Sequence, residues 1–242
     1  MAFTAQDVKA LREKTGVGMM ECKKALVEAD GDMDKAVDFL RERGLAAAAK
    51  KATRIAAEGV VLPYYDAEAK KGVVVEVNSE TDFVAKNEKF MSFVEGVAKT
   101  ILATNPADVE ALKEEKFDGT DRTVTETLND LVLSIGENMK VRRFERMDGI
   151  VSTYIHGGGS VGVMVGFDVA DESKAATAEF DAMGKNVAMQ IAAMSPAYLD
   201  EASVPAEVVE HEKTILAAQM KEDPKMASKP EAVLAKSAAG QM

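Results

Sequence analysis

The residues whose types could support chemistry are His156, the glycine-rich run that follows it, and the single cysteine, Cys22. The run at 157–162, GGGSVG, satisfies the pattern G-x-G-x-x-G, which binds dinucleotides where it joins a strand to a helix. Here residues 163–167, VMVGF, follow instead and are typical of a strand. The run therefore predicts a hairpin turn and no nucleotide site.

His156 and Cys22 each have a structural interpretation beside the chemical one. A lone histidine at a strand end could act as a base or a ligand, but no cysteine or second histidine lies near it in sequence. We expect a structural or surface-contact role for it. Cys22 is in helical phase with Met19 and Leu26, which favours burial over a reactive thiol. With one cysteine and two histidines, the chain predicts no metal site and no cofactor.

The segment at 79–87, SETDFVAKN, holds an apolar ring among polar residues. Thr81 or Asp82 is suited to capping the long helix that follows. Phe83 lies seven residues before Phe90, so it could begin the buried stripe of that helix. It could also project outward as an apolar wedge for a protein partner. The spacing leaves both interpretations open.

The composition restricts the partners of this chain. The 242 residues include 30 Lys and Arg against 41 Asp and Glu, so the net charge is −11. An acidic chain without a concentrated basic face is a poor ligand for a phosphate backbone, and 5% aromatic residues offer little for base stacking. The N-terminus has no targeting pattern, and no apolar run approaches the roughly 18 residues of a membrane span. We expect a cytoplasmic protein that binds neither nucleic acid nor membrane.

The elements that must position these residues begin with three short helices in residues 4–44. Thr4 and Asp7 form the pattern of a capping box at the first helix. Gly44 is placed to end the third helix. The apolar stripes of the three helices are Val8 and Leu11, then Met19, Cys22 and Leu26, then Met33, Ala36, Val37 and Leu40. We expect a small partner-docking module, followed by a helical tether at 45–57.

The remainder of the chain contains an internal repeat with an offset of 90 residues. Residues 59–107 and 149–197 align without gaps and are identical at 14 of 49 positions, where typical composition would give roughly 3 to 5. Each copy predicts a strand, a turn, a second strand and a long helix, and the helix must cover the hairpin because a hairpin cannot bury its apolar face alone. The repeat aligns Phe83 with Ser173, so the shared core does not require an aromatic ring at that position.

Further elements lie outside the two copies. We expect a helical insertion at about 107–137, a strand that starts at 141–144 and leads into the second copy, an acidic helix at about 206–221 and an Ala-rich helix at 231–239. The fold class is therefore α+β, with a core of two related hairpin-plus-helix subdomains. The expected boundaries are 1–44 for the module, 45–57 for the tether, 58–140 for the first subdomain and 141–242 for the second.

Residues 15–26, TGVGMMECKKAL, and residues 81–87, TDFVAKN, closely resemble the two signatures of the bacterial elongation factor Ts family. Residues 136–138 with 142–144, and residues 191–199, are similar to two further segments of that family. The similarity covers almost the whole chain in the order of the family. The resemblance implies a guanine-nucleotide exchange factor for elongation factor Tu, a GTPase, that has no catalytic site of its own.

The resemblance also implies a fold and a set of contact residues. The N-terminal helices would form a ubiquitin-associated-like module, and the two-part core would be of a dimerisation type, which leaves a homodimer through the core open. Thr81, Asp82, Phe83 and Val84 would intrude on the partner, disturb its Mg²⁺ site and loosen GDP. In the N-terminal module, the implied contacts are Arg12, Gly16, Val17, Gly18, Met19 and Met20. His156 is a further candidate for contact with the partner.

Family members continue past the helix at 231–239 into residues that contact the GTPase, whereas this chain ends at Met242. Two other functions stay open. An adaptor with a ubiquitin-associated-like module would ignore elongation factor Tu. An enzyme that uses Glu80, Asp82 and His156 would show turnover without a GTPase.

Overall fold

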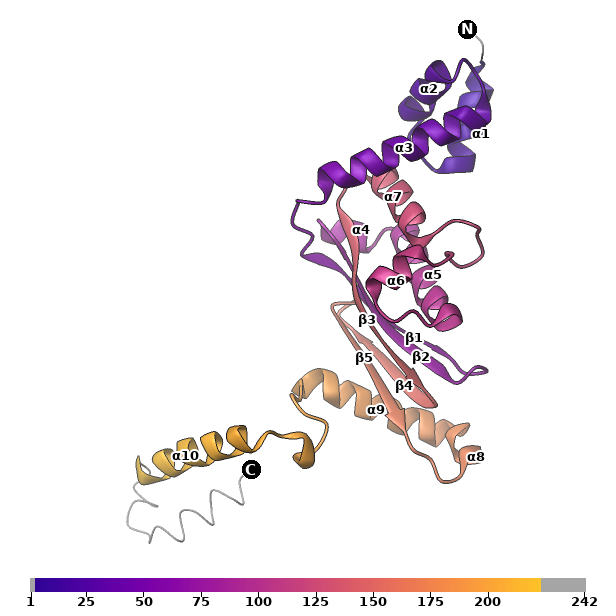
Figure 1. The fold of residues 1–242 in the computed structure, drawn as a ribbon. Coiled ribbons are helices and arrows are strands. Elements are labelled where there is room, and N and C mark those ends of the chain that lie inside the picture. The colour runs from indigo at the N-terminus through magenta and orange to yellow at the C-terminus, as the bar shows by residue number, and fades with distance from the viewer. Residues whose placement is uncertain (1–2, 223–242) are drawn as a thin grey trace. The chain divides into compact units, whose positions relative to one another are not determined.

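The computed structural model describes residues 3–222, in one unit that ends at Met194 and a second that starts at Ser195. The second unit contains a short 3₁₀ helix, η1 (Glu201–Ser203), and helix α10 (Ala206–Glu222), which confirms the expected acidic helix. The Ala-rich helix expected at 231–239 lies outside the described residues. No helix within residues 3–222 is long and apolar enough to cross a membrane. The first unit holds the other elements (Figure 1).

The N-terminal module consists of three helices, as predicted: α1 (Ala5–Thr15), α2 (Met19–Glu28) and α3 (Met33–Lys51). The capping box at α1 is confirmed, since the Thr4 hydroxyl accepts from the amide of Asp7 and the Asp7 carboxylate accepts from the amide of Thr4. The stripes meet in a small core of their own, in which Leu11, Cys22, Leu26 and Ala36 are fully buried.

The expected end of the third helix at Gly44 is wrong, because α3 continues through this glycine to Lys51. A Cβ atom at Gly44 would lie 3.3 Å from the carbonyl oxygen of Asn129 in α7 (Val124–Ile135). The close approach of the two helices explains a glycine in a helix interior, where it costs about 1 kcal/mol against alanine. Leu133 of α7 also packs against the core of the module. The first half of the expected tether is thus part of α3, and the chain leaves helix only after Lys51.

The internal repeat is confirmed by the order and the bounds of the elements. The first copy contains β1 (Glu58–Asp66), β2 (Lys71–Ser79), α4 (Asp82–Ala85) and α5 (Glu88–Thr104). The second contains β4 (Ile150–His156), β5 (Val161–Phe167), α8 (Glu172–Ala175) and α9 (Ala178–Met194). The strand register is shared as well, since Tyr64 pairs with Val73 and Tyr154 pairs with Val163. Both helices of the second copy begin and end 90 residues after those of the first.

The expected insertion is confirmed as α6 (Val109–Glu114) and α7, but the boundary expected after residue 140 cuts through a strand. Strand β3 (Met139–Asp148) pairs antiparallel with β2, so the first sheet has the order β1-β2-β3 and the second contains β4 and β5. Met139 and Val141 are buried in the first core and Phe144 packs against it. The strand therefore belongs to the first sheet, although it leads along the chain into the second copy.

The two hairpins pack against each other through a reciprocal pair of glycine contacts. A Cβ atom at Gly162 would lie 2.7 Å from Val61, and one at Gly72 would lie 3.1 Å from Val151. In the repeat, Gly72 corresponds to Gly162 and Val61 corresponds to Val151. The glycine of each copy therefore contacts the same valine position of the other copy. The close approach of the facing strand favours glycine at both positions, and most strongly at Gly162.

Candidate partner interface

The single-turn helix α4 separates an exposed residue from a buried one. The Phe83 side chain is 81% exposed, whereas Val84 is 6% exposed and belongs to the first core. The interpretation of Phe83 as the start of the buried stripe is therefore wrong. The Val84 side chain anchors α4 to the core, and its expected contact with a partner stays a prediction.

Helix α5 does not use the cap that the sequence suggested. The Asn87 side chain caps it by accepting from the Lys89 amide at 2.9 Å. Thr81 is the N-cap residue of α4 instead, and its hydroxyl makes no capping hydrogen bond there. The expected capping of the long helix by Thr81 or Asp82 is thus wrong, since α4 and α5 are two separate helices.

Thr81 is held by a carboxylate from a distant part of the chain. Its amide donates to one oxygen of Glu137 at 3.0 Å, and its hydroxyl donates to the other at 2.8 Å. The side chain of Glu80, next to Thr81, accepts in turn from the backbone amide of Asn138, next to Glu137, at 2.6 Å. These bonds join the residues before α4 to the connection between α7 and β3. They fix the turn that carries Phe83.

Asp82 is exposed and pairs with Lys86 within α4 and its C-cap, at 2.9 Å. The hydrogen bond from Lys86 and its charge lower the pKa of the Asp82 carboxyl from its ordinary value. Exposed pairs of this spacing contribute little to stability. The carboxylate next to Phe83 is therefore a surface charge that a partner can meet.

The loop between α1 and α2 is fastened to the core by its backbone. Gly16 ends α1 in the left-handed region, with φ of 69°. Its carbonyl oxygen accepts from the Lys89 ammonium at 3.0 Å and from the Ser134 hydroxyl at 2.9 Å. Lys89 lies in the first turn of α5, shortly after α4. The structure thus connects the two predicted contact segments through α5.

The other expected contact residues of the module differ in exposure. Met20 is 66% exposed, and Arg12, Gly18 and Met19 are also at the surface. Val17 is 2% exposed and lies in the core of the module. The expected contact through Val17 is corrected on this ground: its side chain holds the loop in place, and only the loop around it can meet a partner.

His156 lies at the exposed end of β4, and its Nδ1 atom is 3.0 Å from the Tyr154 hydroxyl. The turn after it has the glycines in left-handed conformations, which confirms the predicted hairpin. The amide of Val61 donates to Gly159 in this turn at 2.7 Å, so the turn lies over β1. Within residues 3–222, no group of three or more His, Cys, Asp or Glu side chains could hold a metal ion.

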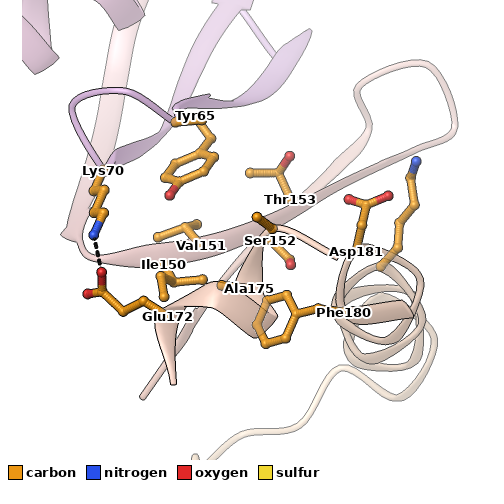
Figure 2. Close-up of a pocket in the computed structure, with 13 residues that line it drawn as sticks. Tyr65, Lys70, Ile150, Val151, Ser152, Thr153, Glu172, Ala175, Phe180 and Asp181 are labelled. Atoms are coloured by element: carbon orange, nitrogen blue, oxygen red, sulfur yellow. Dashed lines mark hydrogen bonds and ion pairs between the residues drawn. The ribbon is translucent and has the colours of Figure 1, made fainter. Parts of the chain in front are cut away.

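A cavity of about 510 Å³ lies between the turn of the first hairpin and helices α8 and α9 (Figure 2). Some of its polar side chains have partners in the structure. Lys70 contacts Glu172 at 2.6 Å, which raises the pKa of Lys70, and the Tyr65 hydroxyl donates to the carbonyl of Gly149 at 3.1 Å. Sequence patterns gave no sign of this cavity, because three distant segments form it.

The fold and its exposed turns define a class: an α+β protein of two hairpin-and-helix units, with an attached three-helix module and an aromatic ring presented to solvent. Comparison with known proteins shows which member of this class it is. A family model described as Elongation factor TS matches residues 80–242. The chain belongs to the elongation factor Ts family.

Individual relatives agree with the family model over nearly the full chain. Elongation factor Ts of Clostridium perfringens (strain SM101 / Type A) is 51% identical over 243 residues, which cover 99% of this chain and 77% of the relative. Elongation factor Ts of Syntrophotalea carbinolica (strain DSM 2380 / NBRC 103641 / GraBd1) is 50% identical over 245 residues, which cover 100% of this chain and 78% of the relative. This similarity identifies the chain as a translation elongation factor of the Ts type.

Proposed function

We propose that this protein binds elongation factor Tu in its GDP form and promotes release of GDP, after which GTP can bind. The observation that carries the proposal is the Phe83 ring, 81% exposed on a turn whose backbone is held by Glu137 and whose next residue is buried. A large apolar ring on a fixed turn provides the buried anchor that a protein interface needs. The protein needs no catalytic site for this role.

The energetics of exchange follow from linkage. If the protein binds the GTPase more tightly when GDP is absent, GDP must weaken that binding by the same factor. An apolar wedge supplies this preference when its pocket forms only in a conformation that holds Mg²⁺ and phosphate poorly. Phe83 is the proposed wedge, and the neighbouring Asp82 carboxylate adds a negative charge close to it.

The N-terminal module provides a second contact in this proposal. Met19 and Met20 are exposed at the start of α2, and flexible apolar side chains of this kind pack readily against a partner helix. We propose that they dock a helix of the GTPase domain, with Arg12 and Gly18 beside them. His156 is a third and weaker candidate contact. The place of action would be the cytoplasm, and a homodimer through the core stays a prediction.

The test measures the release of fluorescent GDP from purified elongation factor Tu, with and without this chain. We expect a faster release that depends on the concentration of the chain, and a smaller effect at high Mg²⁺ because the ion opposes the wedge. Phe83→Ala serves as the matched control. A release rate that the chain does not change would refute the proposal. Binding without release would favour the adaptor function.

A further inference from the structure

Residues 134–138, SIGEN, comprise the last two residues of α7 and its connection to β3, and they contact both of the turns proposed to meet the partner. Ser134, at one end of the segment, donates to the carbonyl of Gly16 in the loop before α2. Glu137, near the other end, accepts from Thr81 just before α4. Two surface turns that are far apart in the chain, at Gly16 and at Thr81, are therefore fastened to one short segment.

Glu137 takes both hydrogen-bond donors that Thr81 has. One carboxylate oxygen accepts from the Thr81 amide and the other accepts from its hydroxyl, at 3.0 and 2.8 Å. A charged acceptor makes such bonds stronger than neutral ones. The equivalent turn of the second copy, α8, uses a different device: the Asp171 side chain accepts from the amide of Ser173 within the same turn. Lys70 of the first hairpin also contacts the Glu172 side chain of α8. The difference is that a distant side chain, Glu137, holds the backbone of the turn that carries the exposed ring.

Asn138 adds two hydrogen bonds in which it is the donor. Its backbone amide donates to the Glu80 side chain at 2.6 Å, and its side-chain nitrogen donates to the carbonyl of Arg54 at 2.7 Å. Asn138 is buried, so the loss of either partner would leave a polar group without its hydrogen bond. Residues 80–81 and 137–138 are thus joined by side-chain bonds in both directions, which resists rotation of the turn.

The contact to Gly16 is shared between Ser134 and Lys89. Both donate to the same carbonyl oxygen, and the Lys89 ammonium lies 3.4 Å from the Ser134 hydroxyl. Because Lys89 is in the first turn of α5, the loop of the module is tied to the helix that follows α4. The spacing between the Gly16 loop and the Phe83 turn is set by these bonds.

We infer that Ser134, Glu137 and Asn138 are positioning residues for the exchange reaction, which hold the two contact turns at the spacing that the GTPase requires. The inference rests on the proposed function. Two contacts on one rigid partner bind together at a lower entropic cost when their geometry is already formed. Glu137 is the residue with the largest expected effect, because it holds the turn of the wedge through two bonds.

The first measurement uses the free protein and follows hydrogen exchange of the Thr81 amide. In Glu137→Ala, this amide should exchange about ten- to a hundredfold faster, the worth of a hydrogen bond to a charged group. In Glu137→Gln, one oxygen can still accept from the amide, so the rate should be intermediate. Glu145→Ala, on the exposed face of β3, is the matched control and should leave the rate unchanged. An unchanged rate in Glu137→Ala would overturn the inference.

The second measurement follows the release of GDP from elongation factor Tu. Glu137→Ala should reduce the stimulation by about tenfold or more, Glu137→Gln should restore part of it, and Glu145→Ala should match the unmodified protein. If Glu137→Ala fails to fold, Thr81→Val removes one of the two bonds and should give a smaller loss of the same kind. If the Thr81 amide of Glu137→Ala exchanges faster but the variant stimulates GDP release normally, the positioning role is refuted.

These outcomes separate the inference from the proposed function. If the unmodified protein does not stimulate release, the proposed function fails, and with it the role in exchange. The Thr81 exchange rate then still decides whether Glu137 holds the turn. If the unmodified protein is active and Glu137→Ala is equally active, only the inference fails.

Discussion

Phe83→Ala separates the folding role of the ring from its role in binding. The side chain is 81% exposed, so about a fifth of it is covered by the rest of the protein. A fully buried aromatic side chain removes roughly 200 Å² from water, so about 40 Å² is covered here. At about 25 cal/mol per Å², the truncation should lower the free energy of unfolding by about 1 kcal/mol. For a chain of this size, that corresponds to a loss of about 2–4 °C in melting temperature.

The effect on the complex should be larger. A buried aromatic anchor contributes about 2 kcal/mol or more at an interface, which is a factor of about 30 in affinity. The assay compares thermal unfolding of the mutant alone with its stimulation of GDP release from elongation factor Tu. Phe90→Ala is the matched control, since this ring is fully buried and its loss should cost roughly 3–5 kcal/mol of stability.

Two results would refute the reasoning. A Phe83→Ala protein that melts as low as Phe90→Ala would show that the ring supports the core. A mutant with normal stability and normal stimulation of GDP release would remove Phe83 from the mechanism. If the ring acts mainly on the Mg²⁺ site, stimulation should fall by a larger factor than affinity for the nucleotide-free partner.

Two further predictions concern the fold. Gly162→Ala should destabilise the protein by about 1–3 kcal/mol, and by more than Gly72→Ala. The added methyl group meets Val61 at 2.7 Å and the ring of Pro63 in one case, and the flexible end of Met164 with Val151 at 3.1 Å in the other. Urea unfolding of both variants measures this, and equal stability would contradict it. Cys22 is buried and its burial raises the pKa of the thiol, so alkylation of the native protein should be slow and should accelerate in urea. Rapid alkylation under native conditions would show that the module opens.

Local patterns in the sequence predicted much of this fold. The capping box at Thr4 and the apolar stripes fixed the three N-terminal helices, because each signal lies within one helix. The offset of 90 residues predicted the order of strands and helices in both copies, since two copies of a sequence that must bury the same face fold alike. The exposed ring could not be assigned from helical phase, and the comparison of Phe83 with Ser173 was the more useful guide.

The failures have a common physical origin in contacts between distant segments. Gly44 has the form of a helix end, but the close approach of Asn129 favours a glycine inside α3. Strand β3 precedes the second copy in the chain, yet its buried residues complete the first core. The hydrogen bonds of Glu137 to Thr81 span 56 residues and have no local signal. The resemblance of residues 136–138 to a family segment drew attention to Glu137, but it did not reveal that Thr81 is its partner.

The repeat itself separates what the fold requires from what function adds. Both copies have a one-turn helix between the second strand and the long helix, so the turn belongs to the fold. In the second copy the turn is capped from within, because Asp171 accepts hydrogen bonds from both the amide and the hydroxyl of Ser173, and its one bond to a distant segment runs from Lys70 to the Glu172 side chain. In the first copy the corresponding position, Phe83, carries an exposed ring, and the bonds that secure the turn come from Glu137 instead. An aromatic ring that is 81% exposed adds little to folding, and the second copy holds the equivalent turn without a carboxylate from α7 or β3. The difference between the copies therefore lies where a partner would bind.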